Sequence, residues 1–352
     1  MIYIIAAILI FGVLIAVHEL GHFLAAKACG VRVNEFSIGM GPTILHKTKG
    51  DTTYSLRLPI GGFCAMEGEE EDSNDPTALN NQSFWKKLII FAAGAFMNFL
   101  TGLIIIVALY AGAKAFYVPV ITDFADGCPL QSESGLQVGD RLVSIDGERV
   151  YVYSDVSLLL GRNKTGVFDL KVKRDGQTVT LKDFPMERAE YTDQQGQTYT
   201  GFGLMFGAEE ATVGSRLRYS WNNAVDFVRI VRLSLQMLVT GEAGLKDVSG
   251  PVGIVSTITD VGEQAESASA AVENIAYLAA LLAVNLAVMN LLPLPALDGG
   301  KIFFLVVNAL CMLTIRKKIP EKFESYVHLA GFALLMLLML VITFQDVWKL
   351  FQ

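Results

Sequence analysis

Four long apolar segments alternate with polar stretches along the chain. They cover residues 2 to 26, 88 to 112, 274 to 292 and 326 to 344. A helix rises about 1.5 Å per residue, so each segment is long enough to cross a hydrocarbon core of about 30 Å. The pattern predicts a polytopic α-helical membrane protein with four transmembrane helices.

The polar connection between the first two segments contains a β-like pattern. Polar and apolar residues alternate from Thr52 to Leu58, and the run Ile60-Gly61-Gly62-Phe63 indicates a bend. We expect a membrane-associated β-hairpin here, with an edge strand around residues 56 to 66. A surface hairpin without a functional edge is an equally good interpretation of the pattern. The acidic run from Glu67 to Asp75 is typical of a solvated loop.

A different composition begins after the second apolar segment. From residue 115 to 206 the sequence has the character of a soluble α+β domain, with β-like runs at 168–173 and 178–182. The residues Asp175 and Gly176 between these runs favour a tight turn. The chain therefore carries a small domain inserted between its membrane segments.

The segment from 207 to 272 is amphipathic rather than uniformly apolar. Its apolar residues recur at helical spacing between Leu217 and Leu238, but Asp226, Arg229 and Arg232 interrupt them. We expect a helix on the membrane surface or against the inserted domain, followed by a re-entrant loop at Ser249 to Ile254. The predicted organisation is thus 1–114, 115–206, 207–272 and 273–352.

Composition supports a membrane protein and excludes one class of partner. Hydrophobic residues make up 52% of the 352 residues, which is high for a soluble protein. The formal net charge of −7 offers no basic surface for nucleic acid. The four cysteines are scattered without metal-binding or disulfide spacing, so they are interpreted as isolated thiols.

Basic residues indicate how the spans are oriented. They gather in the connection after the first span and again between residues 316 and 322, close to span ends. This distribution predicts that both regions are cytoplasmic. The inserted domain and both termini would then be extracytoplasmic, in a multi-pass protein of a plasma membrane.

The first apolar segment contains the run His18-Glu19-Leu20-Gly21-His22. Residues i and i+4 share a helix face, so His18 and His22 can bind one Zn²⁺ while Glu19 acts beside them as general base. Charged and imidazole side chains are costly in hydrocarbon and are rarely placed there without a function. We therefore expect a hydrolytic metal site inside the membrane, near its cytoplasmic face.

A third ligand is expected at the end of the third span. Two prolines, Pro293 and Pro295, break the helix just before Asp298, which stands in an apolar neighbourhood. A lone carboxylate there would be unfavourable, and a metal ion would stabilise it. Asn98 can serve as a contact between helices or line the active-site cavity, and Asn290 can position substrate or orient Asp298.

Taken together, these residues resemble the site-2 protease family of intramembrane metalloproteases. The chain is most similar to the bacterial regulator of sigma-E protease type with one PDZ domain. The resemblance rests on the runs at 18–22, 61–62, 94–99, 250–253 and 290–300, together with the PDZ-like residues 134–147. Ala95 departs from the pattern, because similar members usually carry proline there.

The resemblance implies one Zn²⁺ held by His18, His22 and Asp298, with Glu19 as the general base. It also implies cleavage within the transmembrane segment of single-span proteins, such as an anti-sigma factor or a signal-peptide remnant, after a first extracellular cut. Asn290, Gly61, Gly62, Pro251 and Asn98 are the candidate substrate-binding residues. The PDZ domain is expected either to bind a peptide or C-terminus or to exclude bulky ectodomains.

Three other functions share some of these features. A membrane metallopeptidase with a cytosol-facing site would use the same histidines, although many such enzymes take glutamate as the third ligand. A non-enzymatic PDZ scaffold with structural zinc has no need of an adjacent free glutamate. A zinc carrier would need a second ligand set along a path, and the sequence offers one set.

Overall fold

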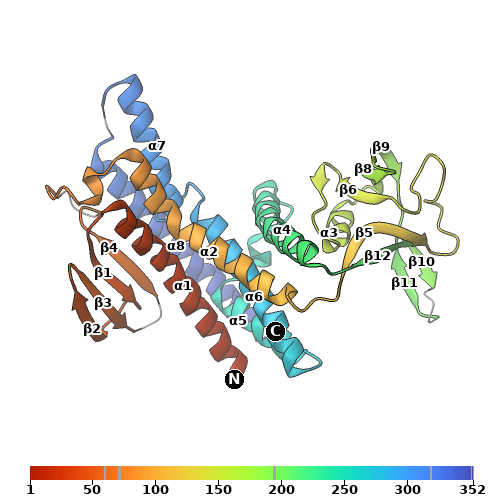
Figure 1. The fold of residues 1–352 in the computed structure, drawn as a ribbon, viewed down its shortest axis with the longest axis horizontal. Coiled ribbons are helices and arrows are strands. Elements are labelled where there is room, and N and C mark those ends of the chain that lie inside the picture. Colours follow the sequence, from red (N-terminus) through yellow and green to blue (C-terminus); the bar gives the residue numbers. More distant parts are fainter. Residues whose placement is uncertain (59–60, 70–72, 193–195, 318, 350, 352) are drawn as a thin grey trace. The chain divides into compact units, whose positions relative to one another are not determined.

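The computed structural model describes all residues except 59–60, 70–72, 193–195, 318, 350 and 352 (Figure 1). The chain divides into two compact units. The first comprises Met1–Ile106 and Phe227–Gln352, and the second comprises Val107–Asp226. Long helices and a small sheet make up the first unit, and a larger sheet dominates the second.

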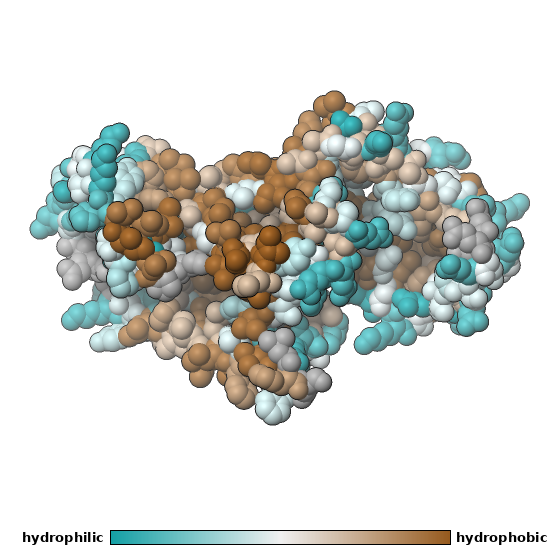
Figure 2. Space-filling view, turned by 90° about the horizontal axis from the view of Figure 1, so that it is seen from below, coloured by the Kyte–Doolittle hydropathy of each residue, from teal (hydrophilic) through white to brown (hydrophobic). Residues whose placement is uncertain are grey.

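Four of the described helices are long and apolar enough to cross a membrane. They are α1 (Ile2–Cys29), α2 (Phe84–Tyr110), α6 (Ala268–Asn290) and α8 (Glu321–Lys349). Figure 2 shows hydrophobic side chains gathered over these helices. The four predicted apolar segments coincide with these helices, and the chain is a multi-pass membrane protein.

Small residues let the helices approach closely. A Cβ at Gly21 of α1 would collide with the backbone carbonyl of Ala93 on α2. A Cβ at Gly102 of α2 would lie 2.9 Å from the carbonyl oxygen of Ala280 on α6. In lipid, such close packing replaces the hydrophobic effect as a source of helix association.

Two further helices in the first unit differ from the sequence interpretation. The prediction of a re-entrant loop at Ser249 to Ile254 is wrong, because Pro251 begins helix α5 (Pro251–Glu263). Proline is favoured in a first helical turn, where its missing N–H needs no partner. The backbone N–H groups of Gly250 and Gly253 donate to Asp346 of α8, at 2.9 and 2.8 Å. The second helix, α7 (Asp298–Thr314), had no counterpart in the sequence analysis.

The small sheet has four strands: β1 (Val33–Ile38), β2 (Thr43–Lys49), β3 (Thr52–Arg57) and β4 (Gly62–Met66). Their order is β2-β3-β1-β4, with β1 parallel to β3 and antiparallel to β4. The predicted hairpin of residues 52 to 63 is therefore wrong, since β1 lies between its two halves. Alternation within a strand does not identify the partner strand, and the bend at Ile60 lies outside the described residues.

The sheet is attached to the helices by apolar packing. Strands β1 and β4 contact α1, and the shared core includes Ala26, Val33, Cys64, Met66 and Ile90. Among the described strands, β4 pairs only with β1 and so has a free edge. Residues 62–66 of the predicted edge strand thus lie at an edge, whereas β3 is internal.

The second unit contains a sheet of order β12-β5-β6-β8-β9, with β7 paired to β6. The hairpin turn between β8 and β9 occurs as predicted, with φ of 49° at Asp175 and 83° at Gly176. The elements are β5 (Ala115–Phe124), β6 (Arg141–Ile145), β7 (Glu148–Arg149), α3 (Ser154–Arg162), β8 (Val167–Arg174), β9 (Gln177–Pro185), β10 (Ala189–Thr192), β11 (Thr198–Gly201) and β12 (Leu204–Glu210). The predicted domain of residues 115–206 falls within this unit, and helix α4 (Val213–Thr240) begins in it.

One buried ion pair joins the loop before β6 to the end of β8. Arg174 donates to both carboxylate oxygens of Asp140, at 2.8 and 2.7 Å, and the backbone N–H of Gln137 donates to the same carboxylate at 2.9 Å. The Asp140 side chain is completely buried. Such a bidentate pair fixes the geometry of both segments.

Candidate metal centre

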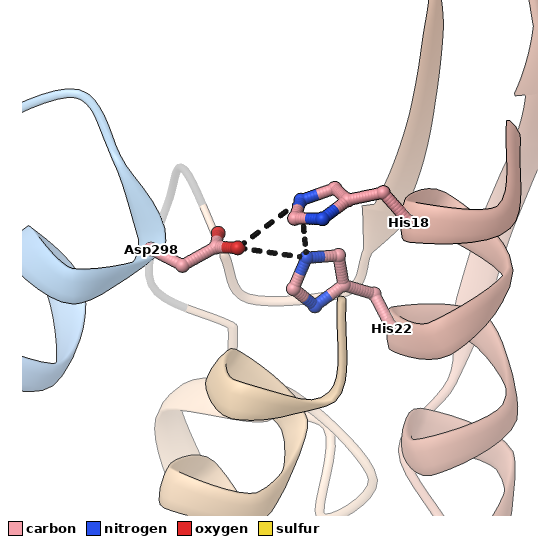
Figure 3. A group of neighbouring side chains, drawn as sticks. All are labelled: His18, His22 and Asp298. Carbon is pink, nitrogen blue, oxygen red and sulfur yellow. Dashed lines mark hydrogen bonds and ion pairs between the residues drawn. The ribbon is translucent and has the colours of Figure 1, made fainter. Parts of the chain in front are cut away.

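Three side chains from distant parts of the chain converge in the first unit. His18 and His22 lie one turn apart on α1, and Asp298 is the first residue of α7 (Figure 3). The Nε2 atoms of the histidines lie 3.2 Å apart, and the Asp298 Oδ2 atom lies 3.1 and 3.2 Å from them. The three ligand atoms therefore form a nearly equilateral triangle.

This triangle suits a divalent metal ion. Three atoms bound tetrahedrally to zinc at about 2.0–2.1 Å lie about 3.3 Å from one another, close to the observed separations. Asp298 Oδ2 is buried and, apart from the two imidazole nitrogens, has no hydrogen-bond partner among the described residues. Two imidazole nitrogens and one carboxylate oxygen form a common donor set for zinc. The residues present fit a zinc ion with three protein ligands.

The surroundings of His22 prepare its ring for metal binding. Its Nδ1 atom lies 2.8 Å from the backbone carbonyl oxygen of Ile90 on α2. A carbonyl can only accept, so Nδ1 carries the proton and Nε2 is left free as a ligand. For His18, the side-chain amide of Asn290 lies 3.5 Å from Nδ1, at the outer limit of a hydrogen bond.

Helix α2 supports the two histidines through a glycine. A Cβ at Gly94 would collide with the His22 ring and lie 2.6 Å from an atom of the His18 ring. Atoms do not approach so closely without displacement, so a larger residue would push the rings from their positions. The run at 94–99 thus begins with a residue that lies directly against both rings.

A locked turn between α6 and α7 presents Asp298. Ala296 has φ of 72°, in the left-handed region that non-glycine residues rarely adopt, and its backbone N–H donates to His328 of α8 at 3.0 Å. A Cβ at Gly331 of α8 would collide with the side chain of Pro295. The last helix therefore holds the turn that carries the carboxylate.

Glu19 lies beside the start of strand β4. A Cβ at Gly62 would approach Cγ of Glu19 to 3.0 Å, so glycine is the residue that lets the strand and the carboxylate lie so close. At the neighbouring Gly61, a Cβ would collide with the side chain of Met40. The free edge of β4 therefore begins next to the candidate general base.

The remaining sequence-derived candidates lie elsewhere. Asn98 is one helical turn after Gly94 and is 1% exposed, and its Oδ1 atom has no hydrogen-bond partner in the part of the chain that the structure describes. Pro251 is exposed at the start of α5, where the neighbouring backbone contacts Asp346. The described contacts bring neither residue to the metal-binding side chains.

Cys64 of β4 is buried near the site but does not belong to the cluster of candidate metal ligands found among the described residues. Burial raises the pKa of its thiol to about 12, and the carboxylates of Glu19 and Glu69 act in the same direction.

Sequence reasoning missed three contributors near the site. The carbonyl of Ile90 and the imidazole of His328 act through contacts that no local motif reveals. Lys301, which pairs with Glu69 at 2.6 Å, could have been noticed as a charged residue at the start of an apolar segment. Such a residue usually has a partner.

Comparison with known proteins gives a consistent result. The sequence model of peptidase family M50 matches residues 6–338. A Clostridium perfringens protein whose name describes it as a zinc metalloprotease is 38% identical over 347 residues, which cover 98% of each chain. The Bacillus subtilis protein named regulator of sigma-W protease RasP is 30% identical over 433 residues, covering 99% of each chain.

Proposed function

The chain belongs to peptidase family M50 and is a zinc metalloprotease of the membrane; from this premise we propose that it cleaves peptide bonds within the transmembrane segments of single-span membrane proteins. His18, His22 and Asp298 hold the zinc ion in this proposal, and Glu19 is the general base. The cleavage follows a first extracellular cut of the substrate.

One observation carries the proposal. Two of the three ligands, His18 and His22, lie on α1 and pack against Gly94 of α2, and both helices are long and apolar enough to cross a membrane. Ligands for a soluble substrate would be expected on a domain surface. Ligands set within a spanning helix instead favour a substrate that is itself in the membrane.

The bound zinc ion, Glu19 and strand β4 have separate roles in the proposed reaction. Zn²⁺, when bound, supplies Lewis acidity that polarises a carbonyl and acidifies water. Glu19 takes the proton from the attacking water and returns it to the leaving amine. A helical substrate hides its carbonyls in hydrogen bonds, so it must unwind near the site. The free edge of β4, which begins at Gly62 beside Glu19, receives the unwound segment by strand addition.

The substrate class follows from the family and from topology. One relative is named a regulator of sigma-W protease, which supports anti-sigma factors as substrates of this chain, together with signal-peptide remnants. We place the site near the cytoplasmic face and the inserted domain outside. That domain acts there as a PDZ module that binds a peptide or excludes intact ectodomains, and Asn98, Asn290 and Pro251 remain candidate substrate contacts.

The test is cleavage of a tagged single-span substrate by purified protein in detergent, with the cut mapped by mass spectrometry. Glu19→Gln should retain zinc and lose at least about 100-fold in rate, because the general base is removed. Glu263→Gln, an exposed glutamate at the end of α5, is the matched control and should be fully active. Cuts confined to the soluble flanks would instead indicate a cytosol-facing peptidase, and products insensitive to Glu19→Gln would indicate a contaminant.

A further inference from the structure

We propose that the ion pair between Lys301 and Glu69 fixes strand β4 relative to the metal ligand Asp298, and thereby selects which peptide bond is cut. Both are positioning residues. The inference rests on the proposed function, because it assigns β4 the task of holding the substrate.

The pair joins the two parts of the site by short paths. Lys301 Nζ lies 2.6 Å from Glu69 Oε1. Lys301 is three residues after Asp298 in α7, and Glu69 is three residues after Met66, the last residue of β4. The other oxygen of Glu69 accepts a hydrogen bond from the Met66 backbone N–H at 3.4 Å. The carboxylate therefore links the end of the strand directly to the first turn of the ligand-bearing helix.

A third element supports the same connection. The Lys301 ammonium lies 5.8 Å from the centre of the Phe91 ring on α2, and Phe91 packs against the core that includes Cys64 and Met66. The Glu69 side chain is 18% exposed and that of Lys301 38%. A partly exposed pair contributes little to global stability. Its value here is geometric, because it joins two segments that are distant in sequence.

Strand geometry explains why this matters for the position of the cut. Residues in a strand are about 3.3 Å apart, and successive side chains point to opposite faces. A substrate paired to β4 presents one bond to the metal only while β4 keeps its place relative to Asp298. If the strand shifts by a fraction of a residue spacing, a neighbouring bond can compete for the same position.

The experiment compares Lys301→Met, Glu69→Gln and the charge-swapped double variant Glu69→Lys/Lys301→Glu with the parent protein. Zinc content, kcat/KM and the mass-spectrometric distribution of cuts are measured on one substrate. Each single variant should keep its zinc, lose about ten- to 100-fold in kcat/KM and cut at neighbouring bonds as well. The double variant restores the ion pair but not the hydrogen bond from the Met66 N–H, because lysine cannot accept, so it should recover part of the rate and narrow the cut distribution.

The matched control is Glu67→Gln. Glu67 is two residues from Glu69, but its carboxylate accepts from Asn34 on β1 at 2.9 Å. This variant should cut as the parent does. Hydrogen exchange of the β4 amides gives a second measurement that does not depend on turnover, and exchange should be faster in both single variants.

Three outcomes would overturn the inference: an unchanged cut distribution in the single variants, β4 exchange equal to that of the parent, or a rate loss that the charge swap does not reduce. The location of the parent's cut tests the proposed function separately. If the parent cuts only soluble flanks, the proposed function fails, while the change in distribution and exchange still decides the role of the pair.

Discussion

Two aspartates, one in each unit, differ in how far the protein itself satisfies their carboxylates. Asp140 is completely buried, and both of its oxygens accept hydrogen bonds from Arg174 or Gln137. The Asp298 side chain is 14% exposed. Its Oδ2 atom lies 3.1 and 3.2 Å from the Nε2 atoms of His18 and His22, and it has no other hydrogen-bond partner among the described residues.

The two carboxylates differ in how many hydrogen-bond donors surround their oxygen atoms. A buried carboxylate without partners is unfavourable, and in Asp140 the cost is offset within the protein itself. Asp298 has two imidazole nitrogens beside it, and the proposed zinc ion would offset its cost. Burial alone therefore does not distinguish the proposed ligand, whereas its position beside two imidazole nitrogens does.

The largest effect is expected from Asp298→Asn. The neutral amide is a weak zinc ligand, so the variant should lose its zinc and all measurable proteolysis. The unfolding temperature of the second unit should equal that of the parent. Metal analysis and thermal unfolding of the full chain test this. Zinc bound at parental stoichiometry would show that Asp298 is not a ligand.

The matching change in the second unit is Asp140→Asn. It leaves Arg174 without its charged partner and should destabilise that unit by about 3 kcal/mol, with zinc content unchanged. Hydrogen exchange of β6 and β8 in the full chain measures the loss. If zinc were lost instead, the two aspartates would not have the separate roles described above.

A smaller effect is expected from Gly94→Ala, which leaves all ligands in place but displaces both imidazole rings. Zinc affinity should fall by about ten- to 100-fold, the range typical of disturbed ligand support. Gly112→Ala is the control, because a Cβ there has open space. Competition with a chelator measures both, and equal affinities would mean that the rings tolerate the added methyl group.

The sequence predicted best those features that depend on one local segment alone. Length and hydropathy located the four spanning helices, and Asp175-Gly176 predicted its turn because both residues favour positive φ. The motif around Glu19 indicated the metal chemistry, since its histidine spacing is a property of a single helix. Such signals need no knowledge of what packs nearby.

Features that depend on distant partners were not predictable in this way. Strand β1 separates β3 from β4, and no pattern within residues 52 to 66 reveals it. Gly250-Pro251 has the composition of a turn, yet Asp346 of α8 caps a helix there. Every residue has a backbone carbonyl, so the residue type of Ile90 does not reveal its contact with His22. The role of Lys301 depends on Glu69, which is distant in the sequence.

The locked turn before Asp298 has a consequence for biosynthesis. His18 and Asn290 are separated by 272 positions in the chain, and the turn that presents Asp298 is held by His328 on the last helix. A ribosome-bound chain that has inserted only its first helices carries both histidines but no complete site. The proposed metal site can therefore be complete only after Asp298 and the last helix have been synthesised and have packed against α1.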